Sequence, residues 1–312
     1  MKAAILGAGL IGRSWAMVFA RGGHDVVLWD QDAQQVEKAL AHIARTLPEM
    51  AEAGLIDDVG AVRERIQGAA TLARAVAGTG FIQENIVERS APKQALFADV
   101  ERLAPADAII SSSTSAIMPS IIFGALATRK RCLVSHPLNP PHLAPIVELC
   151  GGDFTDPETI DRARIFMTDC GMSPIIVKRE IEGFILNRLQ LAVLNEAFRL
   201  IAEDYVTAED LDKTIKDGLA LRWSFMGPIE TIDLNAPNGV ADYIERYGPT
   251  IRRVGDSQSA ARPWPEDIGT KLGAERRAAV PQEKLEDATA WRDRRMMALA
   301  AHKRAQEKKT TR

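Results

Sequence analysis

A histidine and a glutamate lie twelve residues apart, each beside or within a short apolar run of the sequence. His136 follows the apolar run 132–135 and opens the segment HPLNPP (136–141), and Glu148 lies in the apolar run 146–149. Burying a carboxylate is costly unless it has a partner. A carboxylate beside an imidazole orients the ring and stabilises its protonated form, which a general base requires. The pair therefore indicates proton transfer, although a purely structural ion pair explains these two residues equally well.

A second group of residues has the spacing of a dinucleotide site. The motif GxGxxG lies directly between an apolar run (3–6) and a helix-like segment (14–20), and its loop comprises Gly7, Gly9, Leu10, Ile11 and Gly12. The first glycine permits a tight turn, the second lets a pyrophosphate approach the backbone, and the third allows close helix–strand packing. The helix N-terminus then faces the negative charge. The alternative is a flexible surface turn.

An acidic residue follows this loop at the distance that ribose binding requires. Asp30 ends the next apolar run, 18 residues after Gly12, where a carboxylate binds the adenosine ribose. A carboxylate there repels a 2′-phosphate, and position 31 is glutamine rather than arginine. The sequence therefore predicts NAD rather than NADP as the cofactor.

Strands and helices alternate over about 150 residues of the N-terminal part of the chain. Apolar runs at 3–6, 25–30, 81–87, 108–111, 132–135 and 174–178 are typical of strands, and residues 14–20, 34–45, 49–77, 92–103 and 156–171 are typical of helices. This alternation predicts an α/β fold with a doubly wound, mostly parallel Rossmann-type sheet covered on both faces. After residue 183 the apolar residues recur at helical spacing only. We therefore predict an NAD-binding domain over 1–180 and an all-α domain over 181–312.

Composition excludes several classes of protein. The net charge of −3 lacks the basic excess of a nucleic-acid binder. Three widely spaced cysteines without a CxxC pair favour free thiols over disulfides or a metal site. No run of 18 apolar residues predicts a membrane span, and no cleavage pattern follows the N-terminus. We expect a cytoplasmic protein with no metal ion and no nucleic-acid or membrane partner.

Six segments carry a resemblance to a known family. They are GAGLIGRSWAMVFARGG (7–23), IQENIVE (82–88), SSSTSAIMPS (111–120), HPLNPPHLAPIVEL (136–149), GFILNRLQ (183–190) and GLALRWSFMGPIETIDLNA (218–236). With them the chain resembles the L-3-hydroxyacyl-CoA dehydrogenase family, and most closely its lambda-crystallin and L-gulonate 3-dehydrogenase branch. The resemblance implies a Rossmann-type domain that binds NAD, a helical C-terminal domain, and dimerisation of the subunits through that second domain.

The resemblance also implies a role for individual residues in catalysis. His136 takes the proton from a 3-hydroxyl, and Glu148 is its electrostatic partner. Ser115 binds the substrate oxygen, and Asn187 positions the substrate and His136. Taken alone, Ser115 could cap a turn or helix, and Asn187 could bond across helices.

Further residues are implied in binding. Glu88 and Lys93 match positions that line the nicotinamide ribose, and Asn139 lies in the same turn as the base. Arg222 suits bidentate capture of a substrate carboxylate. Lys93 could instead be a solvated surface charge, and Arg222 a solvated or interface charge.

The implied activity is NAD-dependent oxidation of the 3-hydroxyl of a small L-3-hydroxy acid to the 3-keto acid. L-gulonate is the leading substrate. Residues 39–92 contain no lysine to bind the phosphates of coenzyme A, although Arg63 and Arg65 are present. Carnitine and 3-hydroxyacyl-CoA are alternative substrates. A crystallin-like structural protein and an NAD-binding sensor without turnover are alternatives of other classes.

Overall fold

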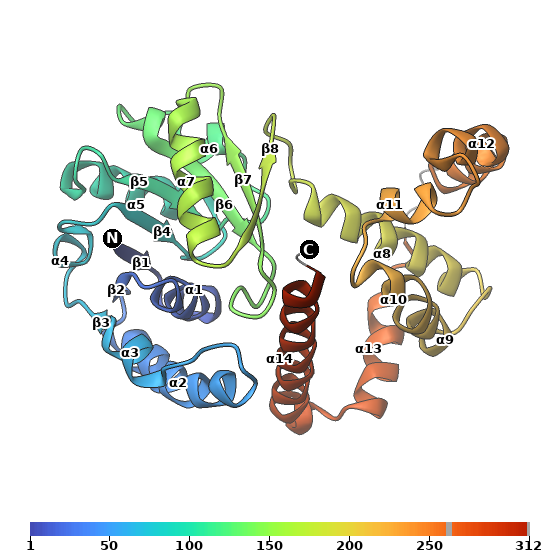
Figure 1. Ribbon diagram of the computed structural model, residues 1–312, viewed down its shortest axis with the longest axis horizontal. Coiled ribbons are helices and arrows are strands. Elements are labelled where there is room, and N and C mark those ends of the chain that lie inside the picture. The colour runs from blue at the N-terminus through green and yellow to red at the C-terminus, as the bar shows by residue number, and fades with distance from the viewer. Residues whose placement is uncertain (260–263, 311–312) are drawn as a thin grey trace. The chain divides into compact units, whose positions relative to one another are not determined.

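The computed structural model describes residues 1–259 and 264–310, which Figure 1 shows as ribbons. Contacts between residues divide the chain into two units. Unit 1 comprises Met1–Arg188 together with Ala290–Arg312, and unit 2 comprises Leu189–Thr289. Each unit is described by itself.

Unit 1 is built on one sheet of eight strands. They are β1 (Lys2–Leu6), β2 (Asp25–Trp29), β3 (Ile66–Gly68), β4 (Phe81–Glu84), β5 (Ile109–Ser112), β6 (Cys132–Pro137), β7 (Ile146–Gly151) and β8 (Ser173–Val177). Their order is β3-β2-β1-β4-β5-β6-β7-β8. All neighbours are parallel except β6 and β7, which are antiparallel. The predicted doubly wound, mostly parallel sheet is confirmed.

Two of these strands are absent from the sequence prediction. The range 49–77, predicted as helix, contains the end of α2 (Ala33–Glu52), α3 (Val59–Glu64), β3 and α4 (Leu72–Val76). Strand β3 has only three residues, of which one is buried, so it leaves too short a pattern to detect. In the sequence, strand β7 is only a short apolar run, because Glu148 interrupts its pattern.

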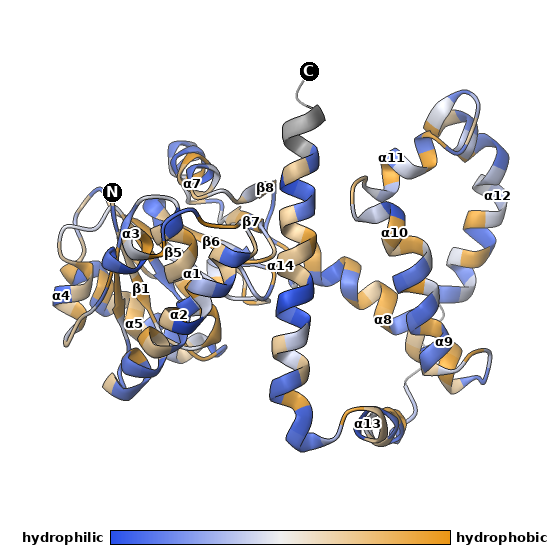
Figure 2. Ribbon diagram, turned by 60° about the horizontal axis from the view of Figure 1, so that its bottom comes forward, coloured by the Kyte–Doolittle hydropathy of each residue, from blue (hydrophilic) through white to orange (hydrophobic). Residues whose placement is uncertain are grey.

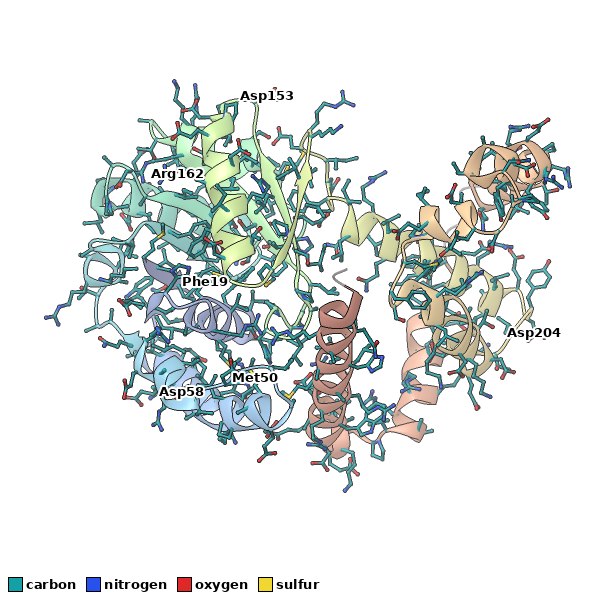
Figure 3. The ribbon with its side chains drawn as sticks, in the orientation of Figure 1. Phe19, Met50, Asp58, Asp153, Arg162 and Asp204 are labelled. Atoms are coloured by element: carbon teal, nitrogen blue, oxygen red, sulfur yellow. The ribbon has the colours of Figure 1, made fainter. Side chains whose placement is uncertain are left out.

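Helices cover both faces of the sheet, as predicted. On one face α1 (Leu10–Arg21), α2, α3 and α7 (Pro157–Asp169) share a core cluster with alternate strand residues such as Ala3 and Ile5. Phe19 of α1 and Met50 of α2, labelled in Figure 3, are buried in this cluster. On the other face α4, α5 (Ser90–Leu103) and α6 (Pro119–Phe123) pack on Ala4 and Leu6.

The last helix, α14 (Leu285–Thr310), belongs for the most part to unit 1. Met297 is 3% exposed in the first core cluster, and Met296 packs against that cluster. The Arg304 guanidinium also donates to the Leu55 carbonyl at 2.9 Å. Unit 1 therefore includes most of the last helix, which the predicted range 181–312 assigns to the helical domain, because Met296 and Met297 pack on the core cluster of unit 1.

Unit 2 contains helices and no strand in its described residues, 189–259 and 264–289. They are most of α8 (Leu186–Ala202), α9 (Ala208–Lys213), a π-helical turn (Thr214–Leu219), α10 (Ala220–Trp223), α11 (Pro228–Asp233), α12 (Gly239–Ser259), α13 (Ile268–Ala279), a 3-10 turn (Gln282–Lys284) and the first residues of α14. The Thr207 hydroxyl accepts from the Asp210 amide and caps α9, as predicted. None of the helices described in the two units is long and apolar enough to cross a membrane.

Candidate active site

The antiparallel strands β6 and β7 place His136 directly opposite Glu148. The His136 Nδ1 atom lies 2.8 Å from the Glu148 Oε2 atom. The histidine is 5% exposed and the glutamate is fully buried. With Nδ1 held by the carboxylate, Nε2 is the nitrogen that is left to exchange a proton with a ligand. The predicted His–Glu pair is thus present in the structure.

The second oxygen of Glu148 fixes the start of α8. Its Oε1 atom accepts hydrogen bonds from the amides of Ile185 at 2.8 Å and Leu186 at 2.9 Å. Ile185 immediately precedes α8 and Leu186 is its first residue, and the N-terminal end of a helix favours a negative charge. Phe184 precedes them with φ of 49°, a conformation that costs a non-glycine residue about 1–3 kcal/mol. Its ring lies 5.6 Å from the imidazole, centroid to centroid, so the turn packs against the histidine.

Asn187 follows these amides and connects the helix to Ser115. The Asn187 side-chain amide donates to the Ser115 carbonyl at 2.7 Å. The Ser115 amide donates to the Glu88 Oε1 atom at 2.7 Å, and its hydroxyl lies 3.3 Å from the same atom. Thr114 also donates to this carboxylate, and Lys93 faces it at 3.3 Å. The structure therefore brings together four residues that the sequence predicted separately: Asn187, Ser115, Glu88 and Lys93.

Lys93 is buried, so it is not the solvated surface charge that the sequence allowed. It is 1% exposed and its Nζ atom lies 2.7 Å from the Glu84 Oε1 atom. Glu84 is fully buried and also accepts from the Ser112 hydroxyl at 2.6 Å and the Ile86 amide at 2.6 Å. Burial raises the pKa of Glu84, while Lys93 and these donors oppose the shift.

Glu84 is a site residue that sequence reasoning missed. It ends the fully buried strand β4, four residues before Glu88. The signal was available, because a carboxylate at the end of an apolar strand needs a buried cation. Burial also acts on the pKa of Glu88, but the bonds from Thr114, Lys93 and Ser115 outweigh it and lower that pKa.

The glycine loop has the geometry that the motif predicts. Gly7 has φ of 94°, and a Cβ atom there would lie 2.8 Å from the Asn85 backbone. A Cβ atom on Gly12 would lie 1.9 Å from the Gly7 carbonyl oxygen. These two positions therefore accept only glycine. Gly9 differs, because a Cβ atom there would meet nothing within 4 Å. The open space beside its backbone fits the close approach of a phosphate group.

A pocket of about 760 Å³ begins at this loop and is lined by Gly7, Gly9, Asp30 and Asn85 among others. The Asp30 carboxylate accepts from the amides of Ala8 at 2.8 Å and Asp32 at 3.0 Å. Leu10 and Ile11 form the first turn of α1, whose N-terminus lies at the loop. The pocket therefore combines a phosphate-binding loop with a carboxylate, which fits a dinucleotide.

Two predicted residues are not joined to this network by a hydrogen bond or ion pair among the described residues. Asn139 is exposed and precedes Pro140 in a cis peptide bond. Arg222 is exposed on α10, in unit 2.

Comparisons with known proteins agree with this geometry. The family described as 3-hydroxyacyl-CoA dehydrogenase, NAD binding domain, matches residues 2–181. The family described as 3-hydroxyacyl-CoA dehydrogenase, C-terminal domain, matches residues 183–276. The two matches meet at the turn that carries Phe184.

Individual proteins are similar over most of the chain. A lambda-crystallin homolog of Mus musculus is 42% identical over 304 residues, which are 95% of this chain and 94% of that protein. An L-carnitine dehydrogenase of Pseudomonas putida is 38% identical over 251 residues, or 80% of this chain and 77% of that protein. The crystal structure of an NAD+-dependent 5-formyl-3-hydroxy-2-methylpyridine 4-carboxylic acid 5-dehydrogenase has the same fold, with a TM-score of 0.84, 24% identity and 98% of each chain covered.

Proposed function

Because the chain belongs to the 3-hydroxyacyl-CoA dehydrogenase family, it is an NAD-dependent dehydrogenase acting on 3-hydroxy groups. We propose that it oxidises a small free L-3-hydroxy acid and that His136 is the base. L-gulonate is the leading substrate of this proposal. The observation that carries this proposal is the buried His136–Glu148 pair at 2.8 Å, anchored to the start of α8. Such a pair supplies an oriented imidazole with one free nitrogen.

NAD, when bound, accepts the hydride from C3 of the substrate. Gly7, Gly9 and Gly12, with the first turn of α1 at Leu10 and Ile11, bind the pyrophosphate, and Asp30 binds the adenosine ribose. Glu88 and Lys93 line the nicotinamide end. Support comes from the pocket of about 760 Å³ that begins at Gly7 and Gly9 and includes Asp30.

The substrate hydroxyl loses its proton to the Nε2 atom of His136. Glu148 holds Nδ1–H, so the lone pair of the neutral ring lies on Nε2. As the ring becomes positively charged, the buried carboxylate stabilises it. One proton and one hydride leave the substrate, and the product is a 3-keto acid. In the reverse direction the imidazolium returns the proton to the ketone oxygen.

Ser115 and Asn187 hold the substrate in this arrangement. The Ser115 hydroxyl binds the reacting oxygen, and Asn187, which already bonds the Ser115 carbonyl, positions it relative to His136. Because Glu148 bonds Leu186, the residue before Asn187, the base and the positioning residue share one helix start. Asn139, in the turn after His136, supports the substrate side.

A free acid is favoured over a thioester by two observations. Residues 39–92 contain no lysine, and exposed Arg222 can pair with a carboxylate in two hydrogen bonds. The similar protein of Pseudomonas putida is named for carnitine, which is itself a free 3-hydroxy acid. Carnitine is therefore the second substrate to test, and a 3-hydroxyacyl-CoA the third.

The substrate proposal is tested by NADH formation. Purified protein is assayed with L-gulonate, L-carnitine, L-3-hydroxybutyrate and L-3-hydroxybutyryl-CoA. We expect the highest kcat/KM with L-gulonate, and a higher kcat/KM with L-3-hydroxybutyrate than with its thioester. A preference for the thioester would contradict the proposal, and NAD binding without any turnover would favour a structural or sensor role.

Replacing Asp30 by alanine is expected to weaken NAD binding about 10- to 100-fold, because a charged hydrogen bond to the ribose contributes about 1.5–3 kcal/mol. NADP binding is expected to change little or improve, since the repulsion of its 2′-phosphate disappears. Titration calorimetry with both cofactors measures the two affinities. Asp58→Ala, which removes a capping carboxylate from α3, is the control. Unchanged NAD affinity in Asp30→Ala would place the ribose elsewhere.

Dimerisation through unit 2 is part of the proposal. Unit 2 exposes large apolar side chains between residues 221 and 234, namely Leu221, Phe225, Ile229 and Leu234, each at least 65% exposed. Figure 2 shows apolar residues on α8 and α10. Exposed apolar surface of this kind is typical of an interface.

Light scattering at micromolar concentration is expected to give twice the mass of one chain. The double variant Leu221→Asp, Phe225→Asp is expected to give the single mass, because two buried charges would oppose the interface. A monomer in the wild-type protein would refute dimerisation.

The proposed location is the cytoplasm. Cys132, Cys150 and Cys170 are free and buried, and burial raises the pKa of each thiol to about 12. Free thiols in an unbridged core suit a reducing compartment.

A further inference from the structure

Unit 1 gathers basic side chains from three helices and one loop, outside the His136 site. Arg13 lies on α1, His42 and Arg45 lie on α2, Arg292 lies on α14, and His142 lies between β6 and β7. We call these five residues the basic cluster. None of them has a role in the dehydrogenation described above.

Packing brings these elements together. Phe19 of α1, Ile43 of α2 and Met297 of α14 belong to one core cluster. The Arg21 guanidinium donates to the His142 carbonyl at 3.2 Å, which fixes the loop against α1. The basic side chains are close enough to act on one another. Burial, followed by the charges of Arg13 and Arg45, lowers the pKa of His42 to about 4.

Two nitrogens of the basic cluster are buried without a partner. His142 is 6% exposed, and its Nδ1 atom has no hydrogen-bond partner among the described residues. The Nε atom of Arg13 is also buried and has no hydrogen-bond partner within the described part of the chain. Buried polar atoms are nearly always hydrogen-bonded. Burial, followed by the charges of Arg21, His42 and Arg13, lowers the pKa of His142 to about 3, so its ring is neutral and can donate one N–H.

The charges around these nitrogens are unbalanced. The main charges that act on Arg13, His42 and His142 within the described part of the chain are positive, and the one acid among them, Asp293, is paired with Arg292 at 2.7 Å. Arg45 and Arg292 are exposed, whereas His142 is buried. The basic cluster therefore combines buried donors with exposed cations, and such a combination favours the binding of an anion.

We propose that the basic cluster binds an oxyanion, with Arg13 and His142 as buried donors and Arg45 and Arg292 at the rim. The ligand is a carboxylate or a tetrahedral oxyanion of similar size. It comes from one of two sources: the carboxylate of the hydroxy acid itself, or a separate anion. The inference goes beyond the proposed function, because binding of an anion requires no turnover.

Sulfate is the probe that tests the site. It is titrated by calorimetry into protein saturated with NADH, so that the glycine loop is occupied, with ionic strength held constant by sodium chloride. We expect saturable binding that Arg13→Gln and Arg292→Gln each weaken about tenfold or more, since charged hydrogen bonds are lost. Arg164→Gln is the matched control, because Arg164 is an arginine of α7 whose side chain is 46% exposed.

Arg292 is exposed, so its variant keeps the test valid if Arg13→Gln fails to fold. Sulfate inhibition that is competitive with the hydroxy acid would assign the site to the substrate carboxylate. Sulfate binding without competition would assign it to a separate anion, and either result supports the site. Absence of saturable sulfate binding, or unchanged affinity in both Arg13→Gln and Arg292→Gln, would refute it. The sulfate titration measures binding and not turnover. Failure of the anion site is therefore distinguishable from failure of the proposed dehydrogenase activity.

Discussion

Replacing His136 by alanine is expected to lower kcat about 10²- to 10⁴-fold, the usual contribution of general acid–base catalysis. The substitution removes the nitrogen that accepts the substrate proton and leaves Glu148 buried without its partner. The glycine loop and Asp30 are unchanged, so NADH affinity is expected to stay within a few-fold of wild type. Steady-state assays measure kcat, and calorimetry measures NADH affinity.

His302→Ala is the control for this experiment, because His302 is exposed on α14. Its kcat is expected to equal that of the wild-type protein. Retained turnover in His136→Ala, with normal kcat, would remove His136 from its role. A loss of NADH affinity in parallel with kcat would instead indicate that the substitution disturbs the fold around Glu148 and the start of α8.

Replacing Lys93 by methionine is expected to lower the free energy of unfolding by about 3–5 kcal/mol, because it leaves a buried charge uncompensated. Glu84 is fully buried and Lys93 is its cation at 2.7 Å. The double variant Lys93→Met, Glu84→Gln is expected to recover part of this loss. Urea unfolding without cofactor measures the stabilities, and Lys38→Met, at an exposed position of α2, is the control.

The loss of stability in the Lys93→Met variant is also expected to depend on pH. Burial raises the pKa of Glu84, and removal of Lys93 raises it further. A carboxyl group whose pKa is higher in the folded state binds more protons when folded, so stability falls as pH rises from the ordinary carboxyl pKa through the raised one. Lys93→Met is therefore expected to be less stable at pH 8 than at pH 5. Equal stability at both values, with a loss no larger than in Lys38→Met, would show that the pair contributes little.

The parts of the site that are local in sequence were predictable. The glycine loop and Asp30 lie within one βαβ unit, so spacing alone places them at one pocket, as the structure shows. The His136–Glu148 pair was predictable from the cost of a buried carboxylate. The strand pairing that forms this pair was not predictable. Glu148 interrupts the apolar pattern of strand β7, and it is this strand that places Glu148 opposite His136.

Contacts between distant segments were not predictable. The sequence leaves a surface location open for Lys93, because its partner Glu84 lies in another element and the ion pair forms only when β4 and α5 pack. The packing of α14 on α1 and α2 also depends on contacts across most of the chain, such as Arg304 to the Leu55 carbonyl. Such contacts leave no local pattern, so the basic cluster appeared only with the structure.

The most direct test of the central claim is the fate of the hydrogen at C3. L-gulonate that carries deuterium at C3 is incubated with NAD and the wild-type protein, and the reduced cofactor is analysed by mass spectrometry. Transfer of the label to the cofactor, at a rate that falls with His136→Ala, is the predicted result. Reduced cofactor without deuterium, or no reduction while NAD is bound, would contradict oxidation at C3 with His136 as the base.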